Sequence, residues 1–198
     1  MVEDTNIKFH EDEGLRVERE PFIHIKVAPV LSAEEAEALL RILDGMDWQR
    51  RKQSFYEFDV VVNQHSQEYL KERLVRSRTI DRAREWLEKY LGTRLAPDVI
   101  VDLHRYSPGT GVGVHTDRPT AEARFVLNLS RSWQPNQGGI WVLSSRSDLK
   151  PPVHFLPPLH NTGFGFLTSA VSYHALSERS FSVTYVVVLR FAIKEHKS

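Results

Sequence analysis

The chain has 198 residues, a length that suits one domain, and its 41% hydrophobic and 26% charged residues are typical of folded globular proteins. Lys and Arg together number 26, as do Asp and Glu, so the net charge is zero and no basic field is available to attract nucleic acid or an anionic membrane. The absence of cysteine excludes disulfides, zinc-thiolate sites, iron–sulfur clusters and thiol nucleophiles, so any metal must be bound by His, Asp or Glu.

The N-terminal segment gives no sign of a targeting signal. Met1–Glu13 is acidic and lacks the apolar core of a secretion signal. No stretch of the chain approaches the roughly 18 apolar residues of a membrane-spanning helix, so a cytoplasmic location is the default expectation. Residues 1–20 are charged and aperiodic, and we interpret them as a flexible leader that precedes a single domain over residues 21–198.

The first predicted elements of this domain are a strand and a helix. Residues 22–27 alternate weakly between apolar and polar side chains, as a half-buried strand does. Ser32 has the character of a helix N-cap, and Glu35, three positions later, completes a capping box ahead of apolar residues at helical spacing. This pattern predicts a helix over residues 33–44.

A second strand and a pair of helices are expected next. Residues 55–62 are rich in aromatic and β-branched side chains, which indicates a strand. Apolar residues recur at helical spacing through residues 67–90, with a break near 77–79, so we expect two consecutive helices. The many Lys and Arg residues of this segment are typical of a solvated helix face.

The character of the sequence changes after Gly92. Short runs rich in β-branched and aromatic residues follow one another, separated by Gly, Pro, Asn and Ser. This arrangement predicts an α+β fold in which N-terminal helices buttress a β-sandwich or β-barrel. The runs that we expect to form strands are 99–106, 125–129, 139–143, 164–168 and 181–191.

Two potential metal ligands lie at the end of a strand-like segment. His115 and Asp117 are two positions apart, so in an extended chain their side chains project from the same face and can reach one ion. Two imidazoles and one carboxylate on one face of a metal, with the other coordination positions open, form the facial triad of non-haem iron(II) oxygenases. A third ligand would have to come from a distant strand.

The order of motifs around this pair adds a family resemblance. A Tyr and a glycine-containing turn precede the pair, and a strand, a glycine pair and a further strand lead to a second His and then to an Arg with Ser and Thr. This combination resembles the Fe(II)- and 2-oxoglutarate-dependent oxygenases, in particular their prolyl-hydroxylase-like branch. The matching segments are Tyr106, Gly109 to Gly113, His115 to Asp117, Phe125 to Leu129, Trp133, Gly138 to Ile140, Phe164 to Thr168, His174 and Arg179 to Thr184.

The resemblance implies a fold, a cofactor and a reaction. The fold would be a double-stranded β-helix, or jelly-roll, whose catalytic core covers about residues 99–192 and is buttressed by the N-terminal helices. His115, Asp117 and His174 would bind Fe(II) and carry catalysis, with 2-oxoglutarate as cosubstrate and O2 as oxidant. The products would be succinate, CO2 and a hydroxylated carbon. Asp117 favours hydroxylation, because related halogenases replace this carboxylate with a small residue.

The distal carboxylate of 2-oxoglutarate needs a cation, and arginine suits this role through its permanently charged, bidentate fork. Arg179 is the first candidate by its place in the family pattern. Arg190 is the second, because it shares the strand parity of the hydroxyl donors Ser182 and Thr184 whereas Arg179 does not. The other residues that the resemblance brings near the cosubstrate are Tyr106, Asn128 and Thr184.

The resemblance also suggests the substrate class. It favours a prolyl or other amino-acid carbon, in a peptide or protein or in a free or carrier-bound amino acid, whereas nucleic acid is disfavoured by the zero net charge. Arg118 and Arg124 lie beside the metal motif and could bind a substrate carboxylate, although we interpret them first as exposed loop residues. His104 is interpreted as a structural histidine.

Two rival functions stay open at this point. One is a non-catalytic jelly-roll module that binds a small ligand, because a fold does not by itself imply an activity. The other is a nucleic-acid demethylase of the same superfamily. No membrane partner is expected, and the sequence makes no prediction of the oligomeric state.

Overall fold

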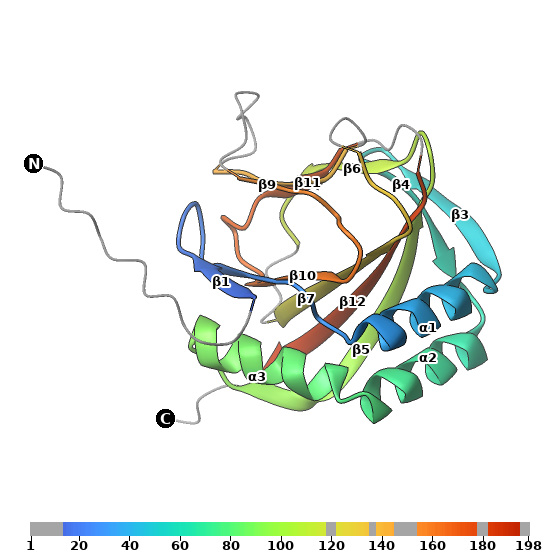
Figure 1. The fold of residues 1–198 in the computed structure, drawn as a ribbon. Helices are drawn as coiled ribbons and strands as arrows, with labels where there is room; N and C mark the ends of the chain where they lie inside the picture. The colour runs from blue at the N-terminus through green and yellow to red at the C-terminus, as the bar shows by residue number, and fades with distance from the viewer. Residues whose placement is uncertain (1–13, 118–121, 135–137, 145–153, 178–181, 195–198) are drawn as a thin grey trace, which may run out of the picture.

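The computed structural model describes residues 14–117, 122–134, 138–144, 154–177 and 182–194. Its strands curl into a flattened barrel, and the helices α1, α2 and α3 lie along one outer face of that barrel (Figure 1). Helices and strands therefore occupy separate layers, as the predicted α+β class requires. None of the helices in these residues is long and apolar enough to cross a membrane.

The described chain opens with an antiparallel pair, β1 (Leu15–Glu18) and β2 (His24–Val27). The predicted leader of residues 1–20 therefore extends too far, because Leu15–Glu18 pairs with β2 and the Leu15 side chain is buried. Only Leu15 and Val17 alternate with charged residues in this strand, and two apolar positions are too few to reveal a period. Residues 1–13 lie outside the described part of the chain.

The helix α1 (Ala33–Asp44) confirms the range predicted from its cap. The backbone N–H of Glu35 donates to the Ser32 hydroxyl at 3.2 Å, and the backbone N–H of Ser32 donates to the Glu35 carboxylate at 3.1 Å. Two N–H groups without partners inside the helix are thus satisfied. The helix buries Ala36, Leu39, Leu40 and Leu43.

The predicted strand and helix pair follow, together with one strand that we did not predict. These elements are β4 (Tyr56–Val61), α2 (Gln64–Arg76) and α3 (Thr79–Leu91). The break between the helices occurs where Arg78 adopts a left-handed conformation with φ of 57°. The additional strand, β3 (Trp48–Gln53), pairs with β4, and its mostly exposed, polar sequence carries no apolar alternation.

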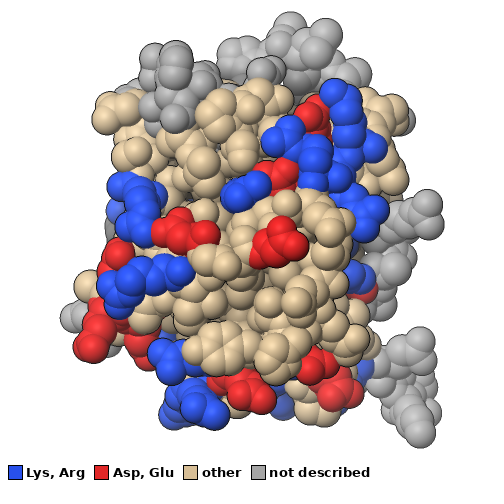
Figure 2. Space-filling view, turned by 90° about the vertical axis from the view of Figure 1, so that its right-hand side faces the viewer, with Lys and Arg blue, Asp and Glu red and all other residues tan. Residues whose placement is uncertain are grey.

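Ion pairs cover the outer face of the hairpin formed by β3 and β4. Asp59 is buried, and its carboxylate accepts from Nε of Arg50 at 2.5 Å and from Nε of Arg105 at 2.9 Å. Nζ of Lys52 lies 2.6 Å from the Glu57 carboxylate. Figure 2, which shows the face at the right of Figure 1, has Lys and Arg residues beside Asp and Glu residues. Two of the three basic residues of β3, Arg50 and Lys52, are therefore paired with acidic neighbours on β4.

The remaining strands form the two sheets of a jelly-roll, which confirms the predicted fold. The larger sheet has the order β10-β7-β12-β5, and the smaller sheet has the order β6-β11-β8-β9. β4 pairs with both β5 and β6 and so joins the two sheets. Their strands are β5 (Leu95–Tyr106), β6 (Gly111–His115), β7 (Glu122–Ser130), β8 (Ile140–Val142), β9 (His154–Leu156), β10 (Thr162–Leu167), β11 (His174–Leu176) and β12 (Thr184–Ile193).

Side-chain alternation gives the larger sheet two different faces. Along β12, Val187, Leu189 and Phe191 join the apolar core that includes the helices, while Val186 and Val188 belong to a second apolar cluster between the two sheets. The interior between the sheets is therefore separated from the helical layer by a single layer of backbone.

Close packing on β10 generates a stability prediction. A Cβ on Gly163 would lie 2.4 Å from Cζ of Phe125 and 2.8 Å from Cγ2 of Val30, well inside van der Waals contact. We expect Gly163→Ala to lower the free energy of unfolding by about 1–3 kcal/mol, the range typical of overpacked cores, as measured by urea unfolding. Gly45→Ala is the matched control, because its Cβ would meet nothing closer than 3.7 Å and it changes the unfolded chain in the same way. Equal stability of the two variants would contradict the prediction.

Candidate metal centre

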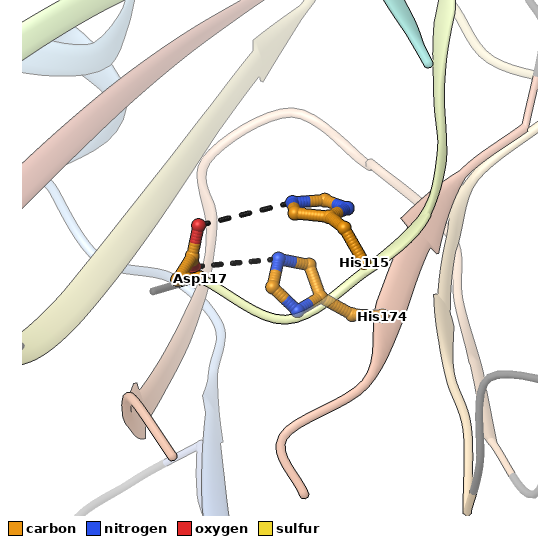
Figure 3. A group of neighbouring side chains, drawn as sticks. All are labelled: His115, Asp117 and His174. Atoms are coloured by element: carbon orange, nitrogen blue, oxygen red, sulfur yellow. Dashed lines mark ion pairs between the residues drawn. The ribbon is translucent and has the colours of Figure 1, made fainter. Parts of the chain in front are cut away.

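The residues predicted to bind metal meet at one end of the smaller sheet. His115 is the last residue of β6, His174 is the first residue of β11, and the two are register partners in adjacent strands. Asp117 follows β6 by two residues, and its carboxylate faces both imidazoles (Figure 3). One ligand atom from each of the three side chains lies within 4.8 Å of the others. Strand pairing thus brings the distant third residue to the predicted pair.

Backbone carbonyls orient both imidazoles. Nδ1 of His115 lies 2.9 Å from the Gly113 carbonyl oxygen, and Nδ1 of His174 lies 3.0 Å from the Ser172 carbonyl oxygen. A carbonyl oxygen can only accept, so each Nδ1 carries a proton and donates it, and in the neutral form of each imidazole the lone pair is then on Nε2. The two Nε2 atoms lie 3.8 Å and 3.6 Å from oxygens of Asp117. Both lone pairs are therefore available to a common ion.

The carboxylate of Asp117 also fits a bound cation. Its Oδ1 lies 2.6 Å from Nη1 of Arg124, whereas its Oδ2 is buried and has no hydrogen-bond partner in the described part of the protein. A buried carboxylate oxygen without a partner is costly unless a cation or donor approaches it. Two imidazoles and one carboxylate are the donor set of a facial triad, so these residues fit a divalent iron ion.

Burial keeps His174 in the form that binds metal. Loss of contact with water, and next the proximity of His115, lowers the pKa of His174 to about 4. The imidazole is therefore neutral at neutral pH, and a metal ion does not have to displace a proton from it.

The metal centre opens into a cavity between the two sheets. The cavity has a volume of about 440 Å³, within the range of pockets that hold small molecules. Its walls are aromatic and aliphatic side chains from both sheets, including Phe58, Ile140, Phe164, Phe166 and Val188. Water around the metal would be restricted by these apolar walls.

Two of the predicted cosubstrate residues line this cavity. They are Tyr106, at the end of β5, and Arg190, near the end of β12. The guanidinium of Arg190 lies 2.8 Å from the Glu122 carboxylate. Because it lines the cavity, Arg190 lies on the interior face of β12, as its strand parity with Thr184 predicted. Arg179 lies outside the described residues, and so does Arg118.

Asn128 and Thr184 are not among the residues that line the cavity. Both continue the interior faces of their strands, but toward the end away from Arg124 and Arg190, which are register partners. Asn128 donates to Thr162 at 3.4 Å, and the Thr184 hydroxyl lies 3.2 Å from that of Ser130. Packing against neighbouring strands buries both side chains away from the open space.

His104, which we interpreted from the sequence as a structural histidine, contributes to the cavity wall. It shares the interior face of β5 with Tyr106, and its ring lies 4.4 Å from that of Phe58. Burial lowers the pKa of His104 to about 4. The two-residue spacing from Tyr106 was the available signal, because residues i and i+2 share a face.

Arg124 also lies on the cavity wall rather than in an exposed loop. It belongs to β7, which begins at Glu122, and its side chain is about four-fifths buried, with 21% exposed. The interpretation of Arg124 as an exposed loop residue was therefore wrong, because β7 extends further toward the metal motif than its apolar run indicates.

Comparisons with solved structures find the same fold. A Pseudomonas putida prolyl-4-hydroxylase is 18% identical, with a TM-score of 0.63 over 87% of this chain and 92% of that chain. A 2OG-Fe(II) oxygenase family oxidoreductase from Burkholderia pseudomallei is 15% identical, with a TM-score of 0.64 over 87% and 88%. A Trichoplax adhaerens prolyl hydroxylase, in complex with a peptide fragment of the hypoxia inducible factor oxygen degradation domain, is 12% identical, with a TM-score of 0.63 over 85% and 83%.

These similarities extend over most of each chain, beyond the half that carries the sequence motifs. At identities of 12 to 18% they establish the fold, which is that of the oxygenases predicted from the sequence. No protein-family model and no curated protein matches the sequence.

Removal of either imidazole tests the metal centre. We expect His115→Ala and His174→Ala each to abolish retention of Fe(II), because two of three ligands do not complete a facial triad. Anaerobic dialysis followed by iron analysis would measure this, and circular dichroism would show that the fold persists. His160→Ala is the control, since His160 is exposed and does not line the cavity. Normal iron retention in either ligand variant would refute the assignment.

Proposed function

We propose that the chain is an Fe(II)- and 2-oxoglutarate-dependent dioxygenase that hydroxylates an unactivated C–H bond. The observation that carries this proposal is the arrangement of His115, Asp117 and His174 in the wall of a cavity inside a jelly-roll. The free Nε2 lone pairs and the unpartnered Oδ2 all belong to this group. Iron supplies redox chemistry with O2 that no described side chain could supply.

The protein's own residues would hold and isolate the reacting groups. His115, Asp117 and His174 would bind iron on one face and leave its other positions open to cosubstrate and O2. Backbone carbonyls would keep the imidazoles oriented, which is a common way to fix metal ligands. Apolar side chains such as Phe164 and Phe166 would exclude water from the bound cosubstrate.

The cosubstrate contacts follow the sequence prediction in part. Arg190 and Tyr106 line the cavity, which supports a role for both in binding 2-oxoglutarate. Arg179, Asn128 and Thr184 stay predictions for this role. The apolar walls suit the methylene carbons of the cosubstrate, and charged groups gather near the metal.

The substrate class is an amino-acid carbon, either a prolyl or other residue in a peptide or an amino-acid-derived small molecule. The cavity volume of about 440 Å³ suits a small molecule or one side chain together with the cosubstrate. A nucleic-acid substrate is disfavoured, because the net charge of the chain is zero. The cytoplasmic location stays a prediction.

Absorption spectroscopy tests the cofactor assignment. Anaerobic protein loaded with Fe(II) should develop a metal-to-ligand charge-transfer band when 2-oxoglutarate is added, because the keto acid would chelate the iron. His174→Ala treated in the same way should give no band. On admission of air, the wild-type protein should release succinate. A wild-type protein that binds iron yet shows neither a band nor succinate would leave the non-catalytic binding module as the better reading.

A further inference from the structure

Two arginines face each other in the wall of the cavity. Arg124 on β7 and Arg190 on β12 are register partners on adjacent strands, and both side chains line the cavity. Like charges directly opposite each other on neighbouring strands are destabilising. Such a pair needs compensation from carboxylates, from a ligand or from both.

The compensation within the protein is unequal. Arg190 is well satisfied, because the Glu122 carboxylate accepts from its Nη2 at 2.8 Å and from its Nε at 3.2 Å. Asp102 accepts a further hydrogen bond from Nη1 of Arg190 at 3.3 Å. Three of its five N–H donors are therefore already used, and two carboxylates offset its charge.

Arg124 is engaged at one atom only. Its Nη1 lies 2.6 Å from Asp117, whereas its Nη2 is 3.6 Å from Glu122, beyond hydrogen-bonding distance. Its Nε is buried and has no hydrogen-bond partner among the described residues. Arg124 therefore keeps unused donors immediately beside a metal ligand.

Metal binding would change the balance of charge at this place. Without a metal, three carboxylates stand against two guanidinium groups, and the excess is negative. A divalent ion would reverse the excess and make the cluster attract an anion. The groups concerned are Asp102, Asp117, Glu122, Arg124 and Arg190.

We propose that Arg124 binds a carboxylate of the small molecule that lies next to the iron. The proposal rests on the proposed function, since it takes the metal to be bound and the cavity to be the reaction site. The planar fork of arginine matches a carboxylate, and Arg124 keeps donors without partners while its Nη1 contacts the metal ligand Asp117. The carboxylate belongs either to the distal end of 2-oxoglutarate or to a substrate with a free acid group.

Paired ligands that differ in one carboxylate would test this role by calorimetry on anaerobic Fe(II) protein. The first pair is 2-oxoglutarate and 2-oxovalerate, which share the keto acid but differ at the distal end. The second pair is L-proline and L-prolinamide, added to protein saturated with 2-oxoglutarate. We expect the wild type to prefer the carboxylate of at least one pair by roughly tenfold or more, as a charge-assisted hydrogen bond gives.

The variants Arg124→Gln, Arg124→Lys and Arg190→Gln complete the experiment. Arg124→Gln should reduce the preference to less than about threefold, and Arg124→Lys should restore part of it, because charge is kept and the fork is lost. Loss in the first pair identifies the cosubstrate as the source of the carboxylate. Loss in the second pair identifies a free acid substrate rather than a residue within a peptide.

Three results would overturn the proposal. One is a wild type with no carboxylate preference in either pair, and another is a preference that Arg190→Gln abolishes while Arg124→Gln leaves it intact. The third is an Arg124→Gln variant that binds iron and both members of each pair more weakly by one common factor, because this shows a residue that only positions Asp117. Failure of the proposed function is separable, since it would remove the absorption band from the wild type itself.

Discussion

The pairing of β6 with β11 is the constraint on which the rest of the molecule depends. His115 and His174 are far apart in the sequence, and only this register places them side by side. A shift by one residue would turn one imidazole to the other face of the sheet. The register is supported from both sides, because β4 pairs with β6 and β8 pairs with β11. The smaller sheet thus positions His115, Asp117 and His174, although its strands contain only three to five residues.

The larger sheet supplies most of the side chains that surround these three residues in the cavity. Its interior face carries apolar residues such as Val126 and Val188, together with the charged pair Arg124 and Arg190 close to the metal ligands. Charge is concentrated at one end of the cavity, and apolar surface covers the rest. The cavity therefore suits a ligand that has both a charged group and an apolar part, which agrees with the proposed oxidation of a small-molecule or side-chain carbon.

Much of the fold could be predicted from the sequence, where the signal is local. The capping box at Ser32 predicted α1, and the break near Arg78 predicted the separation of α2 from α3. The two-residue spacing of His115 and Asp117 predicted that both side chains lie on one face of the chain. The missed features depend on contacts between distant segments. β3 is charged and exposed, and β11 is too short to show a period. The sequence offered Arg124 as a possible carboxylate ligand but not its position opposite Arg190, because strand register is not specified by a single sequence.

A single layer of strands separates the helices from the cavity, so changes in the packing of the helices can affect the cavity. Leu189 packs into the helical core and Arg190, its neighbour in the chain, enters the cavity, so a repacking of the helical side would tilt the strand that carries the charge. The helices are therefore more than a cover that could be exchanged for another. Transfer of the proposed iron site to a different scaffold would therefore require the helical layer to be transferred as well.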